Sequence, residues 1–326
     1  MMDGLMDGLM DRETLGPDDA VDLHMHTFAS DGRWTPEELT AYLMANNFRM
    51  VALADHDTMY SVPEMARRAR EAGIHFIPAV EMTTRWEQRQ VHLLVYGVRP
   101  EAASSAPFMA VLDTQQRQLR ETSERMIELL DKHCRYIPSL HELPEIRLGL
   151  QLTPHRVFTA MIRNGHGNNL YQAHNIVRGL GEPVVVDVPL DETVEAAHAS
   201  GALTIVAHPG RDDGSGVLKE EDLDRMRAEI PIDGVEAHYR SYKDADTEYY
   251  RGWAERNGLL VSSGSDSHWP NHPVNPIAHN ARWVAPFLER LGYSVEPWEG
   301  PAWLPTPPPD PPPPAEGYTD AATPEA

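Results

Sequence analysis

The stretch VDLHMHTFASDG, residues 21–32, places two histidines one residue apart behind an aspartate, and a second aspartate follows five residues later. Because a β-strand sends alternate side chains to the same face, Asp22, His24 and His26 would all point the same way in an extended strand. Such a row is either a polar strand face turned to water or the beginning of a metal site. The His-x-His pattern alone does not decide between the two.

Acid and histidine motifs recur along the chain at the ends of short apolar runs. The runs predicted as strands are residues 21–27, 50–55, 74–82, 91–98, 203–208, 233–238 and 259–264. The motifs ADHDT (54–58), AVEMT (79–83), AHPGR (207–211), EAHYR (236–240) and SGSDSH (263–268) lie at the C-terminal ends of such runs, and His92 begins the fourth. Barrel enzymes build their sites at the carboxyl ends of parallel strands, so this placement favours one shared site over unrelated surface residues.

The residue types in these motifs indicate divalent-metal chemistry. Imidazole nitrogens and carboxylate oxygens, without thiolates, suit hard and borderline cations. One carboxylate bridging two metals would let a shared water ionise near neutral pH and attack an ester. The sequence contains neither a Ser-His-Asp pattern nor a glycine fingerprint for phosphate, since the glycines of RDDGSG (211–216) lack the required spacing.

Helical patterns alternate with the predicted strands. Residues 36–47, 62–73 and 243–258 are typical of helices that follow strands, which favours a parallel sheet closed as a barrel. About 100 residues, 99–202, break this rhythm. They contain a long amphipathic helix over about 108–134 and helical pieces near 154–164 and 170–180, so we expect a helical insertion.

Both ends of the chain differ in composition from its middle. Residues 1–19 contain a short MDGL repeat and few core-forming residues, and residues 298–326 are rich in proline. We expect a disordered N-terminal segment, a folded unit over 20–297 and an extended, disordered tail. Docking of a proline-recognition partner on that tail is the alternative to a solvated segment.

Composition limits the compartment and the partners. The 326 residues include one cysteine, Cys134, which excludes an internal disulfide framework and a cysteine zinc cluster. No run approaches the roughly 20 apolar residues of a membrane span, and the first residues lack the features of a signal peptide. We therefore expect a cytoplasmic protein without a membrane partner. The net charge of −22 argues against binding duplex DNA, although bound cations could reverse the sign locally.

The order of the motifs resembles a known family. DLHMHTFASDG, LADHDT, VEMTTRW, VHLLVYG, VAHPGR and GSDSH are similar in sequence and order to the polymerase-and-histidinol-phosphatase (PHP) phosphoesterases. The resemblance covers roughly residues 20–270. It implies an α/β fold, a distorted (β/α)7 TIM-like barrel, with three divalent metal ions that could be manganese, iron or zinc.

The resemblance also implies a ligand set. His24, His26, Glu81 and Asp266 would hold the first metal, Glu81 would bridge to a second completed by His92 and His208, and Asp31, His56 and His268 would hold the third. Glu81 and Asp266 are accordingly the expected catalytic carboxylates. Asp22, Asp55 and Asp57 are expected to orient ligands or form turns.

Four further residues are candidates for contact with substrate. Arg211 follows the His-Pro-Gly turn and could hold phosphate through a bidentate contact. His238 could donate a proton to the leaving group, with a buried structural histidine as the equal alternative. TPHRVF (153–158) resembles the arginine-proline-histidine stretch of a nucleotide-hydrolysing PHP branch, with threonine in place of the arginine, so His155 and Arg156 are candidate phosphate contacts.

The insertion after the fourth strand resembles the PHP branch that hydrolyses 3′,5′-bisphosphonucleotides and short RNA. We therefore expect hydrolysis of phosphomonoesters, with small phosphorylated nucleotides or short single-stranded oligonucleotides as substrates. Tyr171, near the expected inner edge of the insertion, could stack on a base. A histidinol-phosphate-type phosphatase and a non-catalytic metal-binding regulatory module are the alternatives. The sequence does not indicate an oligomeric state.

Overall fold

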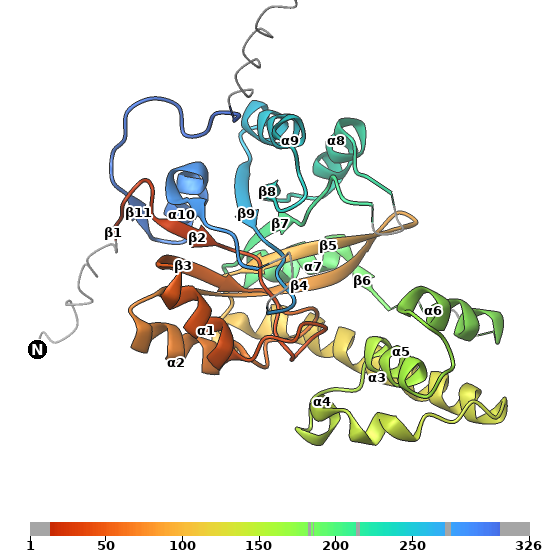
Figure 1. Cartoon of the computed structure of the whole chain (residues 1–326). Helices are drawn as coiled ribbons and strands as arrows, with labels where there is room; N and C mark the ends of the chain where they lie inside the picture. The colour runs from red at the N-terminus through yellow and green to blue at the C-terminus, as the bar shows by residue number, and fades with distance from the viewer. Residues whose placement is uncertain (1–13, 182–183, 185, 213–215, 271–274, 307–326) are drawn as a thin grey trace, which may run out of the picture.

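The fold is seen in a computed structural model that describes residues 14–181, 184, 186–212, 216–270 and 275–306 (Figure 1). Its main sheet has the strand order β10-β2-β3-β4-β5-β7-β8-β9, with β6 paired to β4. The strands are β2 (Ala20–Asp22), β3 (Phe48–Leu53), β4 (His75–Trp86), β5 (Arg89–Tyr96), β6 (Val188–Pro189), β7 (Leu203–Val206), β8 (Gly234–Tyr239), β9 (Leu260–Gly264) and β10 (His279–Asn280).

The sheet curls until its two ends meet. Leu23 N donates to Ser263 O at 3.1 Å and His26 N donates to Ser267 O at 2.9 Å, which joins the chain after β2 to β9 and the loop that follows it. Asp266 N donates to His24 O at 2.7 Å across the same seam. The result is a nearly closed α/β barrel, which confirms the expected fold class.

Two strands of the main sheet depart from the expected parallel arrangement, and one of them is the short β10, which runs antiparallel to β2. β5 runs antiparallel to both β4 and β7, because it returns from β4 through a two-residue turn in which Glu87 has φ +52°. The first residues of β5 therefore lie at the same edge of the barrel as the last residues of the parallel strands. This reversal explains why His92, near the start of its strand, can join side chains from the carboxyl ends of the other strands.

Amphipathic helices cover the outside of the barrel (Figure 1). They are α1 (Pro36–Ala45), α2 (Val62–Ala72), α7 (Leu190–Ala199), α8 (Glu220–Glu229), α9 (Asp244–Arg256) and α10 (Ala285–Arg290). Helix α1 begins with a capping box between Thr35 and Glu38. No helix among the described residues is both long enough and apolar enough to cross a membrane.

The helical excursion has a small core of its own. It comprises most of α3 (Ala106–Lys132), then η2 (Pro138–Glu142), α4 (Pro144–Arg147), α5 (Pro154–Arg163) and α6 (Leu170–Gly179). Met126, Leu130, Val157, Met161 and Val177 are buried together in it. Within the expected limits of about 99–202, α7 and the first turns of α3 pack into the barrel core rather than into this small core.

Residues next to both ends are also structured. β1 (Thr14–Leu15) pairs in parallel with β11 (Ser294–Val295), and Leu15 is fully buried, so the expectation of disorder through residue 19 was wrong for 14–19. Near the other end, the Trp303 ring packs edge-on against His238 and Thr306 N donates to Asp244 Oδ2 at 2.7 Å. Residues 1–13 and 307–326, where disorder was also expected, lie outside the described residues.

Replacing Leu15 with alanine tests whether β1 is part of the fold. Removing a fully buried leucine side chain should lower the free energy of unfolding by about 2–5 kcal/mol. Thr14→Ala, at an exposed neighbouring position, should change it by about 0.5 kcal/mol or less. Urea denaturation of both variants measures the difference, and equal midpoints would show that β1 does not contribute.

Candidate metal centre

The metal-ligand candidates converge at one end of the barrel, where β2, β3 and β9 end and β5 begins. A first group comprises His24, His26, Glu81 and Asp266, whose nitrogen and oxygen atoms lie within 4.8 Å of one another. All four side chains are fully buried. These are the four residues expected around the first metal, and the barrel brings them together from the segment after β2, from β4 and from the loop after β9.

Glu81 lies at the centre of the cluster. Its Oε2 is 2.9 Å from His24 Nε2 and 3.1 Å from His26 Nε2, whereas its Oε1 is 3.1 Å from His92 Nδ1 and 3.0 Å from His208 Nε2. Oε2 therefore faces His24 and His26, with His56 Nε2 also 3.4 Å away, whereas Oε1 faces His92 and His208. This division is the geometry that a carboxylate bridging two ions would need.

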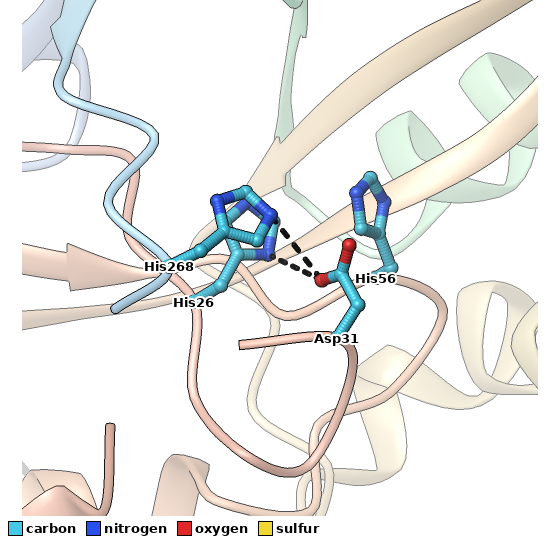
Figure 2. Close-up of side chains that lie close together, drawn as sticks. All are labelled: His26, Asp31, His56 and His268. Atoms are coloured by element: carbon cyan, nitrogen blue, oxygen red, sulfur yellow. Dashed lines mark ion pairs between the residues drawn. The ribbon is translucent and has the colours of Figure 1, made fainter. Parts of the chain in front are cut away.

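A further group, drawn in Figure 2, comprises His26, Asp31, His56 and His268. Asp31 Oδ1 lies 3.3 Å from His268 Nε2 and 3.9 Å from His26 Nδ1. The three expected ligands of the third metal are thus together, with His26 next to them. His56 also groups with Glu81 and His92, so the three candidate positions share residues.

The donor set fits divalent ions. His26 Nδ1, Asp31 Oδ1, His56 Nδ1 and Asp266 Oδ1 are buried atoms that make no hydrogen bond to the described residues. Buried polar atoms are normally satisfied, so such a concentration in one place calls for a ligand. Imidazole and carboxylate donors without thiolates suit manganese, iron or zinc.

The histidines of the cluster differ in charge. Burial lowers the pKa of His26, but its contacts with Asp266 and Glu81 outweigh burial and raise the pKa to about 10. The pKa of His24 is also raised, by Glu81 and Glu236 against the effect of burial. Burial lowers the pKa of His56 to about 3, so that imidazole is neutral. Protons on His24 and His26 therefore occupy positions that a cation would take.

Three aspartates hold the loops that carry the ligands. Asp55 accepts from Thr27 N at 2.7 Å and from Ser30 Oγ at 2.7 Å, which fixes the turn before Asp31. Asp57 accepts from Thr83 N and Thr83 Oγ1, both at 2.8 Å. Asp22 accepts from Ser265 N and Ile277 N, both at 3.0 Å, and burial raises its pKa to about 6. None of the three belongs to the ligand groups described above.

Two expected ligands have unusual backbone geometry. His208 and Asp266 have φ values of +27° and +50°, in a region that L-residues rarely adopt. The backbone is held there by hydrogen bonds, from His208 N to Glu236 Oε2 at 2.9 Å and from Asp266 N to His24 O at 2.7 Å. Strain of this kind persists where the surrounding structure enforces it.

Glu236 is a site residue that the sequence interpretation missed. It is fully buried, its Oε1 lies 3.0 Å from His24 Nδ1, and its Oε2 accepts from His208 N at 2.9 Å. A carboxylate on the outer nitrogen fixes the tautomer and orientation of a metal-binding imidazole. A Cβ on Gly264 would collide with His24 and come within 2.6 Å of Glu236 Oε1, so this contact requires glycine there.

The Asp266 carboxylate organises a second set of side chains. Its Oδ2 accepts from Tyr239 OH at 2.8 Å and from Arg211 at 2.8 Å, and Arg240 lies 3.3 Å away. Arg240 also donates to the Asp266 backbone carbonyl. The expectation placed Arg211 at the site, and the structure brings it there, but Arg240 was overlooked although it closes the EAHYR motif.

Comparisons with known proteins agree with this geometry. Residues 22–137 match the family model of the PHP domain. A 5′-3′ exoribonuclease from Haemophilus influenzae is 31% identical over 255 residues, which are 76% of this chain and 90% of that protein. The chain belongs to the PHP domain family.

Other similar proteins cover comparable lengths. A 3′,5′-nucleoside bisphosphate phosphatase from Chromobacterium violaceum is 26% identical over 269 residues, 79% of this chain and 90% of that protein. The solved structure of an amidohydrolase from the same species, with bound sulfate and no metal, is 26% identical, covers 83% of this chain and 96% of that one, and has a TM-score of 0.64. A Bifidobacterium adolescentis structure, 24% identical with a TM-score of 0.67, shares the fold.

The PHP assignment confirms the resemblance inferred from the motif order. It makes this PHP protein a metal-dependent phosphoesterase, a hydrolase of phosphoester bonds. The clustered histidines and carboxylates supply the positions where its ions can bind.

The structure does not bring every candidate to the centre of the PHP site. The His238 ring stacks on Trp283 at 4.9 Å, and Arg251 lies 3.1 Å from its Nε2, all outside the ligand groups. The bulge in β8 between Glu236 and His238 is the reason, because it turns the two side chains to different sides. These surroundings favour the buried structural histidine of the two alternatives, and the role of His238 as proton donor stays a prediction.

The insertion candidates have different surroundings. His155 lines a cavity of about 240 Å³ next to Asp31, His56 and His92. Arg156 is 3% exposed and donates to backbone carbonyls of the 28–30 loop, including Ala29 O at 2.9 Å, so it acts as a support for that loop. The expected stacking residue Tyr171 is 75% exposed and does not line this cavity.

Replacing Glu236 should weaken metal binding in the PHP protein. Loss of an outer partner of a metal-binding histidine typically costs 10–100-fold in affinity, so Glu236→Ala should fall in that range and Glu236→Gln should be milder. Manganese titration calorimetry on each folded variant gives the affinity. Glu221→Gln, on the exposed side of α8, is the control. Unchanged affinity in Glu236→Ala would refute this positioning role.

Metal binding to the PHP site should release protons. At pH 7, below the pKa of about 10 for His26, a cation must displace protons from His24 and His26, so the apparent affinity should rise with pH. Titrations in buffers of different ionisation enthalpy measure the number released. His26→Ala should lower that number, whereas His56→Ala should not, because His56 is already neutral. Equal proton counts in all three proteins would contradict the assignment.

Proposed function

We propose that this PHP protein hydrolyses phosphoester bonds in small phosphorylated nucleotides or in short single-stranded oligonucleotides. The observation that carries the proposal is the cavity of about 240 Å³ at the metal centre. Part of its lining consists of ligand candidates, including Asp31, His56 and His92, and another part comes from the helical insertion, including Leu119 in α3 and His155 in α5. A phosphate at the ligand wall would leave its nucleoside against the insertion.

The lining of the cavity suits a nucleoside. Thr58, Thr83, Gln90 and Gln151 offer hydroxyl and amide groups, and Leu119 and Val186 offer apolar surface. Pockets for small molecules combine apolar walls with a few placed polar groups in this way. His155 adds an imidazole whose pKa is lowered by burial, so we assign it a neutral hydrogen-bonding contact with substrate.

We propose three divalent ions, in the positions expected from the ligand pattern. When bound, they would polarise the phosphate and lower the pKa of a coordinated water. Glu81 would hold the shared position and Asp266 would complete the first one. Arg211 and Arg240, both on Asp266 Oδ2, lie where their guanidinium groups can turn toward a phosphate oxygen.

The names of similar proteins support a nucleotide substrate. Besides the exoribonuclease and the bisphosphate phosphatase, a phosphoribosyl 1,2-cyclic phosphate 1,2-diphosphodiesterase from Eggerthella lenta is 24% identical over 256 residues. Each named substrate carries a ribose phosphate. A histidinol-phosphate-type phosphatase is disfavoured because its substrate would leave the insertion wall without a contact. A purely regulatory module is disfavoured because every expected ligand is present.

The substrate proposal predicts a preference between two phosphomonoesters. With manganese-loaded protein, kcat/KM for a nucleoside 3′,5′-bisphosphate should exceed that for histidinol phosphate by at least about tenfold, the equivalent of one good hydrogen bond to a charged group. Glu81→Ala should abolish both activities, and duplex DNA should remain uncut. A higher kcat/KM for histidinol phosphate would overturn the nucleotide assignment while leaving phosphoester hydrolysis intact.

A further inference from the structure

A separate groove, of about 630 Å³, borders the loop that carries Asp31. It shares Ser30, Asp31, His155 and Arg156 with the cavity at the metal centre, so the two spaces adjoin at one ligand candidate. The mononucleotide proposed above occupies only the first space. The groove is therefore available to a second group that is bonded to the same phosphate.

The groove combines an aromatic ring with positive charge. Trp269 is 38% exposed, and the Arg33 guanidinium lies 5.9 Å from the centre of its ring. Arg163, exposed near the end of α5, lines the same groove. Two exposed arginines in one groove stand out in a chain of net charge −22. An aromatic platform beside cationic groups is the arrangement that binds single-stranded nucleic acid.

The groove also contains acidic groups. Asp31 is a ligand candidate, and its charge would be balanced by a bound cation. Glu145 Oε2 is buried and makes no hydrogen bond to the described residues. A buried acceptor without a donor is costly, and the amino group of a nucleobase is a donor that could satisfy it. The apolar floor, which includes Phe28, Leu148 and Ile162, suits the face of a base.

We propose that this groove binds the second nucleotide of a single-stranded oligonucleotide, with its base on Trp269 and its next phosphate near Arg33 and Arg163. The proposal rests on the proposed function, because it places the phosphodiester at the metal centre. Water adds to phosphorus, the bond to the terminal nucleotide breaks, and that nucleotide leaves with a hydroxyl group. The phosphate remains on the rest of the chain, which the groove retains.

The test compares two substrates in the same manganese-loaded protein, a nucleoside 3′,5′-bisphosphate and a 5′-phosphorylated RNA trinucleotide. The readout is the ratio of kcat/KM for the trinucleotide to kcat/KM for the bisphosphate. A stacked base contributes about 1–3 kcal/mol, so Trp269→Ala should lower the ratio by about 5- to 150-fold. Trp269→Phe keeps an aromatic ring at this position and should retain most of the wild-type ratio.

A matched control is available on the insertion. Tyr171→Ala removes an aromatic ring that is 75% exposed and lies outside both spaces, and it should leave the ratio unchanged. Arg163→Gln tests the groove at a residue that, unlike Trp269, is not next to the ligand candidate His268 in the sequence. It should lower the ratio and reduce the slope of log kcat/KM for the trinucleotide against log salt by about 0.7, the value for one lost contact with a single strand.

The possible results distinguish a failure of the groove proposal from a failure of the proposed nucleotide hydrolysis. If neither substrate is hydrolysed, the nucleotide proposal itself fails and the groove proposal falls with it. If the bisphosphate is hydrolysed but the trinucleotide is not, or if Trp269→Ala and Arg163→Gln leave the ratio as Tyr171→Ala does, the groove is not a nucleotide subsite. Should Trp269→Ala unfold, the Arg163→Gln ratio and salt slope decide the matter.

Discussion

The structure of the centre depends on one buried carboxylate. Glu81 is fully buried, and burial alone would raise its pKa, yet the surrounding histidines bring the pKa well below the ordinary value. A buried anion of this kind is tolerated only where positive charge compensates it. Protons on the surrounding histidines, among them His24, provide that charge. Bound cations would replace those protons, so the cluster that stabilises Glu81 is also the one prepared to exchange protons for metal.

The reversed strand is what gathers the ligands around Glu81. In a fully parallel barrel, a histidine at the start of its strand would lie at the opposite end from the site. Because β5 follows β4 through a two-residue turn, Thr83 pairs with His92 across the hairpin, and His92 faces Glu81 Oε1 at 3.1 Å. The same hairpin removes the helix that would otherwise connect two parallel strands. The connection to β7 instead passes through the insertion, which forms the outer wall of the cavity.

The sequence located the histidines and carboxylates that the barrel brings together, because they belong to short motifs within or next to apolar runs. It predicted supporting residues poorly, for a physical reason. Glu236 and His24 are 212 residues apart in the sequence, and no local spacing of residues predicts their contact. Regular alternation along a strand would have put Glu236 and His238 on the same face of the sheet. The bulge between these two residues shifts the register and interrupts that alternation. Likewise, composition could not reveal that Leu15 pairs with the chain near Val295, since a two-residue strand has no periodicity.

The insertion is coupled to the metal centre as well as to the substrate. The guanidinium of Arg156, in α5, donates to Ala29 O at 2.9 Å and lies 3.3 Å from Phe28 O, within the loop that presents Asp31. Asp55 holds that loop from the barrel side through Thr27 and Ser30. Gly32 completes it, because a Cβ there would lie 2.8 Å from Thr27 O. Asp31 is therefore positioned jointly by the barrel and by α5. A substrate that moves the insertion would consequently act on the third ligand group as well, since the same arginine borders the cavity, the groove and the loop.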